Sequence, residues 1–129
     1  DNVPITFDIY IPSSKILEIK NKLYRLMEKY KNLKLIYVDL YSSMSTLGLD
    51  IMVPLSDLKS YEKFFLELKQ YVLSINGSLS FAHGVGTRLL PHIKDELDEE
   101  HLFLFRKIKK ALDPNNILNP GKLGDSIGY

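Results

Sequence analysis

One histidine in this sequence stands in a setting that suits proton transfer to or from a ligand. His83 is followed by Gly84 and Gly86 in the run FAHGVG, and Arg88 comes shortly after. Imidazole exchanges protons near neutral pH, and glycines let backbone approach a planar ligand closely. A guanidinium can pair with a carboxylate through two hydrogen bonds. The same residues are also typical of an exposed loop histidine and a solvated arginine at a helix start, and that alternative stays open.

The end of the sequence is the second unusual feature. Residues 111–122 (ALDPNNILNPGK) contain two proline turns, the second formed by Asn119, Pro120, Gly121 and Lys122. Proline and glycine impose a defined, non-helical path on such turns. Because chain ends are normally loose and solvated, a tail with this much local structure is expected to dock on a partner.

These two segments together resemble a known family. GSLSFAHGVGTRLLPHI (residues 77–93), then a charged helix and KKALDPNNILNPGK, is similar to the end of the C-terminal domain of FAD-linked oxidases. These enzymes form the vanillyl-alcohol-oxidase-like superfamily, which includes glycolate oxidase and D-lactate dehydrogenase. The family pattern there is approximately GG-S-[IV]-S-x-E-H-G-[IV]-G, some twenty residues, then K-x-x-LDPxxILNPGK. The resemblance is strong over about residues 77–123.

The resemblance implies a cap domain that covers the flavin of a larger enzyme. An N-terminal domain of the same polypeptide, absent from this chain, would hold the FAD. His83 would be the catalytic base that takes the hydroxyl proton of a 2-hydroxy acid (glycolate or lactate-like) or a related alcohol, and Arg88 is the candidate for binding an anionic substrate group. Contacts to the cofactor side are expected from five positions: Gly84, Gly86, Asn119, Gly121 and Lys122.

The sequence departs from the family at the metal site. Many members that oxidise 2-hydroxy acids bind a divalent metal through two histidines on the second and third strands and a glutamate before the catalytic histidine. Here His83 is the first histidine of the chain, Ala82 replaces the glutamate, and Asp39 and Asp50 alone are too few for a zinc-like site. We therefore expect no metal. Two interpretations remain: a metal-independent enzyme, or a divergent, non-catalytic subunit of a glycolate-oxidase-type complex.

The elements that must position these residues alternate regularly. Strands are predicted at residues 5–11, 33–41, 47–53 and 78–82. Helices are expected to open at 12–14, with a serine as the N-cap, and at 54–56. A final helix is expected at about residues 98–112. The order βαββαβ, with strand–Pro–helix junctions that repeat at a constant offset, predicts an α+β, ferredoxin-like antiparallel sheet with helices on one face. Residues 1–98 would form the core of the cap, and 99–129 its C-terminal helix and docking tail.

Composition excludes several classes of function. The 17 basic and 16 acidic residues balance, so nucleic-acid binding is not expected, and without cysteine there is no disulfide or thiolate site. No apolar run is long enough to span a bilayer. The first residue is Asp1 rather than Met, which is compatible with a piece of a larger cytoplasmic protein, or one held at the membrane by a partner subunit; a homo-oligomer is also compatible. The alternative from a different class is a self-contained ferredoxin-like module that binds a ligand or subunit without catalysis.

Overall fold

The computed structural model describes residues 1–40, 46–79 and 84–122. The chain divides into two compact units, Asp1–His83 and Gly84–Tyr129, and each is described by itself. Within the described residues, no helix combines the length and the apolar character needed to cross a membrane.

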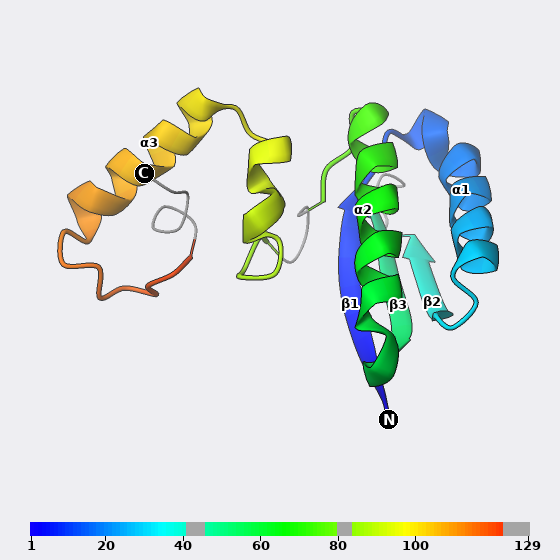
Figure 1. Cartoon of the computed structure of the whole chain (residues 1–129). Helices are drawn as coiled ribbons and strands as arrows, with labels where there is room; N and C mark the ends of the chain where they lie inside the picture. Colours follow the sequence, from blue (N-terminus) through cyan, green and yellow to red (C-terminus); the bar gives the residue numbers. More distant parts are fainter. Residues whose placement is uncertain (41–45, 80–83, 123–129) are drawn as a thin grey trace. The chain divides into compact units, whose positions relative to one another are not determined.

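The first unit is an antiparallel sheet with two helices. Strands β1 (Asn2–Tyr10), β3 (Thr46–Pro54) and β2 (Lys34–Leu40) lie side by side in the order β1-β3-β2 (Figure 1). Helix α1 (Ile16–Lys29) follows β1, and α2 (Leu58–Ser74) follows β3. The α+β sheet expected from the sequence is confirmed. Each strand lies within about three residues of its predicted position, because alternation of apolar residues is a direct signal of a half-buried strand.

Both helices cover the same face of the sheet. Phe7 of β1 contacts Phe65 of α2 edge to face, with ring centroids 6.0 Å apart, and it pairs with the buried Leu49 of β3. The cross-strand partners on this face are apolar in every row, whereas the opposite face carries polar residues such as Asp50. Phe64 of α2 is fully buried and contacts Tyr30 edge to face, with ring centroids 6.2 Å apart, whereas Leu58 at the start of α2 is 44% exposed. The buried apolar core residues of the two helices are Ile19, Leu23, Leu26, Phe64, Phe65, Leu68 and Val72, and Tyr30 at the C-cap of α1 is also buried.

The two strand–helix junctions are built alike, as the sequence repeat predicts. Pro12 and Pro54 both have extended backbone (φ −58°, ψ 134° and φ −62°, ψ 131°). Each is followed by one 3₁₀ turn, Ser13–Lys15 (η1) and Leu55–Asp57 (η2), before the α-helix begins. The prediction of a serine N-cap for the first helix is wrong, because the N-cap of α1 is Lys15 and it makes no side-chain cap hydrogen bond. The 3₁₀ turn itself makes the first hydrogen bonds and places the serines inside it.

A sharp turn leads from α2 to the predicted fourth strand. Asn76 adopts φ 58°, and the amide of Gly77 donates to the carbonyl of Val72 at 2.9 Å, which closes the helix. Ser78 then forms an isolated antiparallel bridge with Tyr10 on the outer side of β1, through hydrogen bonds of 2.8 and 3.0 Å. The start of the fourth strand is therefore where a ferredoxin-like sheet requires it. Residues 80–83 of that prediction lie outside the described residues.

The second unit contains a 3₁₀ helix, η3 (Leu90–Asp95), and α3 (Glu99–Leu112). Asp98 caps α3 by accepting the amide of His101 at 2.9 Å. A small apolar cluster joins the two helices, with Ile93 and Leu102 buried at its centre. The predicted final helix is confirmed, and its N-cap is the acidic residue at which the prediction began.

Candidate functional site

The proposed base, His83, lies among residues 80–83 and thus outside the described part of the chain. Both flanks of this segment are described. Before it, the Tyr10–Ser78 bridge attaches the chain to the edge of β1. After it, the run from Gly84 to Arg88 leads into η3. The assignment of His83 as a base therefore rests on its sequence motif.

Gly84 and Gly86 both adopt left-handed backbone, with φ 72° and 56°. A Cβ built on either would meet no described atom within 4 Å. Glycine is therefore favoured at these two positions by the backbone conformation and not by lack of space, since residues with a Cβ rarely adopt such φ values. Between them, Val85 packs against the Ile93–Leu102 cluster, and its carbonyl accepts the amide of Leu89 at 3.2 Å. Val85 therefore anchors the loop, while the backbone of Gly84 and Gly86 on either side is exposed and accessible to a ligand.

Arg88 is exposed in the turn that precedes η3, one residue before the N-cap Leu89. It does interact with another residue of the protein. Its exposure and its position soon after the glycine loop are compatible with binding an anion, and no described contact assigns it that role.

The tail is organised by a carboxylate that the sequence analysis did not single out. Asp113, 6% exposed, accepts the amides of Ile117 at 2.9 Å and Leu118 at 2.8 Å, and the ammonium of Lys109 at 2.5 Å. The hydrogen bond from Lys109 and those from the two amides hold the pKa of Asp113 below its usual range. These contacts give a physical reason for the LDPNNIL pattern, because the aspartate closes the loop onto the end of α3.

The second turn of the tail is displayed at the surface. Asn119 and Gly121 have left-handed φ values of 52° and 75° and are exposed, whereas Lys122 is half-buried. Ile117 and Leu118, which precede the turn, are 74% and 63% exposed. Exposed aliphatic side chains on an ordered loop are typical of a docking surface.

The carboxylates of the sheet lie on the face opposite the helices. Asp8 and Asp39 are both cross-strand partners of Gly48, and Asp50 pairs with Thr6 and Tyr37. Asp39 and Asp50 thus lie on the polar face of the sheet together with Asp8, which is 2% exposed. In the described ranges 1–40, 46–79 and 84–122, no three acidic or histidine side chains are grouped so that they could hold a metal ion.

The glycine loop and the tail can now be compared with known proteins. Residues 1–123 match the family described as FAD linked oxidases, C-terminal domain. The chain belongs to this family. Both the glycine loop (residues 84–86) and the LDPNNILNPGK tail (residues 112–122) of this FAD-linked oxidase domain lie within the matched range.

Individual relatives match about half of this FAD-linked oxidase domain. It is 49% identical over 51 residues to a mitochondrial D-lactate dehydrogenase (cytochrome) of Arabidopsis thaliana, covering 40% of the chain and 9% of that protein. It is 43% identical over 65 residues to the D-lactate dehydrogenase of Archaeoglobus fulgidus, covering 50% and 14%. It is 33% identical over 67 residues to the glycolate oxidase subunit GlcD of Bacillus subtilis, covering 52% and 14%. Each alignment thus covers no more than 14% of the relative.

Proposed function

We propose that this chain is the cap domain of an FAD-dependent oxidoreductase that oxidises a 2-hydroxy acid of the glycolate or lactate type. The observation that carries the proposal is the family match over residues 1–123, since several relatives are named for oxidation of such acids. The named activities belong to those proteins, and their extension to this chain is our inference. The runner-up, a ligand-binding module without catalysis, does not account for the docking features of the tail.

The described residues are better suited to covering the flavin ring than to binding the whole FAD molecule. Gly84 and Gly86 present backbone without side chains, which suits close approach to a flat ring. The chain has no glycine-rich dinucleotide fingerprint, so the FAD would be held by another part of the polypeptide. When bound, FAD supplies the chemistry of accepting a hydride from the alcohol carbon.

The residues of this chain would supply acid–base chemistry and orientation. His83 would remove the hydroxyl proton as the hydride leaves, a role that suits a side chain with a pKa near neutrality. Arg88 would pair with the substrate carboxylate, which fixes the orientation of the hydroxyl-bearing carbon. Gly84 and Gly86, which follow His83 in the sequence, would let the backbone there lie against the ring.

The exposed apolar residues of the second unit support docking onto an FAD-binding part. Besides Ile117 and Leu118, helix α3 exposes a row of large apolar side chains, Leu104, Phe105, Ile108 and Leu112, and Phe103 is exposed to one side of this row. In water such a row is costly to leave uncovered, because burying apolar surface contributes about 25 cal/mol per Å². We infer that the α3 face and the tail bind the FAD-binding part of the polypeptide.

Anaerobic reduction of the flavin tests the proposal directly. The complete polypeptide that carries this chain would be mixed without oxygen with glycolate, D-lactate, L-lactate and larger 2-hydroxy acids, and the bleaching of the visible absorbance of the oxidised flavin would be followed. We expect saturable bleaching by at least one acid. A flavin that dithionite reduces but no hydroxy acid bleaches would overturn the proposed activity and favour a non-catalytic subunit.

A further inference from the structure

Strand β2 is an exposed, largely apolar sheet edge. The other outer strand, β1, begins to be paired by Ser78, whereas among the described residues no strand pairs with the outer side of β2. Ile36 and Tyr37 are 50% and 55% exposed, and Val38 is 43% exposed. A row of free N–H and C=O groups beside apolar side chains is a template for pairing with another strand.

A bulge gives this edge an internal symmetry. In a regular strand Lys34 and Asp39, which are five residues apart, would point to opposite faces. The pairing of β2 with β3 skips Ile36, so Lys34 lies opposite Met52 and Asp39 opposite Gly48, on the same face of the sheet. Leu35 and Val38, three residues apart, likewise point to one face because of the bulge. They pair with Ile51 and Leu49 on the face that the helices cover.

We propose that β2 pairs antiparallel with β2 of a second copy of this chain, around a two-fold axis at Ile36 and Tyr37. In this register Lys34 lies opposite the partner subunit's Asp39, and Leu35 lies opposite the partner subunit's Val38. The symmetry repeats both contacts. Neither Lys34 nor Asp39 has an ion-pair partner within the part of the chain that the structure describes, so both charges are available for the contact. Opposite charges that face each other across two strands stabilise the pairing.

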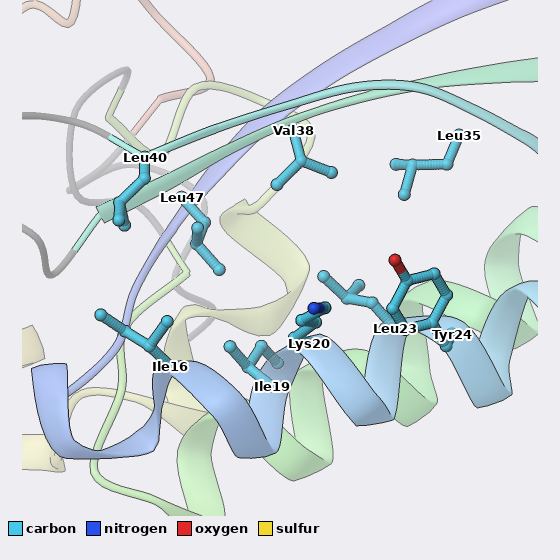
Figure 2. Close-up of a pocket in the computed structure, with 9 residues that line it drawn as sticks. All are labelled: Ile16, Ile19, Lys20, Leu23, Tyr24, Leu35, Val38, Leu40 and Leu47. Carbon is cyan, nitrogen blue, oxygen red and sulfur yellow. The ribbon is translucent and has the colours of Figure 1, made fainter.

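The apolar surface under the same edge favours an added strand. A cavity of about 320 Å³ lies between β2 and α1. Figure 2 shows Leu35, Val38 and Leu40 projecting from β2 toward Ile16 and Leu23 of α1. Because the cavity is bordered by the unpaired strand, extending the sheet would cover part of its mouth and bury Val38 and Leu40. A C₂ pair of this kind also closes on itself, so it predicts a dimer rather than a filament.

Charge exchange at the two positions tests the register. In the complete polypeptide that carries this chain, Lys34→Glu places two carboxylates opposite each other at both symmetric contacts, and Asp39→Lys places two ammonium groups there. Each single variant should weaken the dimer about tenfold or more in Kd, as measured by sedimentation velocity across a concentration series. The double variant Lys34→Glu/Asp39→Lys should restore it. An equimolar mixture of the two single variants should form a heterodimer, because both of its contacts are then attractive.

The controls separate this contact from general charge effects and from misfolding. Lys59→Glu makes the same charge change on the exposed surface of α2, and it should leave the dimer unchanged. Circular dichroism and the flavin spectrum report whether each variant is folded, and heterodimer formation itself requires both single variants to be folded. A monomeric parent protein would overturn the proposal, and so would a dimer whose Kd is unaffected by either single variant. Neither result bears on the proposed oxidase activity.

Discussion

Replacing Gly77 with alanine should destabilise the connection between α2 and the segment that carries His83. A Cβ at this position would lie 2.5 Å from the carbonyl oxygen of Tyr10, 2.7 Å from Cγ1 of Val72 and 2.9 Å from the carbonyl oxygen of Val72. An ordinary contact begins at 3.4 Å, so the backbone must move by about 0.9 Å. Two of the three obstacles are main-chain atoms, which cannot rotate away as a side chain can.

The cost follows from what that movement disturbs. The bridge between Tyr10 and Ser78 consists of hydrogen bonds of 2.8 and 3.0 Å, and Gly77 itself donates to Val72. Losing net hydrogen-bond energy of about 1 kcal/mol per bond, with steric strain of about 1–3 kcal/mol, gives a loss of roughly 2–5 kcal/mol in the free energy of unfolding. That is a large share of the stability of a domain of this size.

Urea unfolding of the chain, followed by circular dichroism, measures this difference. The matched control is Ser74→Ala, which changes an exposed residue in the last turn of α2 and should alter the free energy of unfolding by less than about 0.5 kcal/mol. If Gly77→Ala is as stable as the control, the close approach of this turn to β1 is wrong, and the placement of the fourth strand on the edge of β1 loses its support.

Three further changes test other parts of the structure. Leu102→Ala should lower the stability of the second unit by about 2–5 kcal/mol by opening a cavity beside Ile93, whereas the exposed Leu104→Ala should cost little; urea unfolding of both variants checks this. Asp113→Asn should speed amide hydrogen exchange at Ile117 and Leu118 about tenfold, as read by NMR or mass spectrometry; unchanged exchange would contradict the capping role. The hydrogen bonds from Lys29 and Tyr30 lower the pKa of Glu67, so the stability they contribute is present above about pH 4.5 and is lost as the pH falls through the lowered pKa. Glu67→Gln should therefore be less stable than the parent at about pH 7, and the gap should narrow in acid; a gap independent of pH would refute this linkage.

Most of the first unit could be predicted from the sequence because its signals are local. Alternating residues identified three strands, and the repeated strand–Pro junctions at Pro12 and Pro54 identified the start of both helices. The Asn76–Gly77 end of α2 also follows from local chemistry, since asparagine and glycine are the residues that tolerate left-handed backbone.

The features that were missed depend on contacts between distant residues or on competing local geometries. Serine is a common N-cap, but a 3₁₀ turn stands in place of the predicted cap before α1, and the residue types do not distinguish such a helix start from a capped one. The bulge at Ile36 depends on how β2 aligns with β3, which is a property of two strands. Asp8 reads as an ordinary polar residue of an alternating strand, although it is buried. For Asp113 a signal existed, because an aspartate before proline at a helix end often caps the loop that follows.

The central claim is that His83 acts as the base in oxidation of a 2-hydroxy acid by a bound flavin. The most direct measurement is the rate of anaerobic flavin reduction by the best substrate in His83→Ala, compared with the parent and with His101→Ala, which changes an exposed histidine on α3. Loss of a positioned base predicts a rate lower by roughly 10²–10⁴-fold in His83→Ala and nearly unchanged in His101→Ala. A decrease of less than about threefold in a flavin-loaded His83→Ala protein would contradict the claim, because a general base contributes at least about a hundredfold.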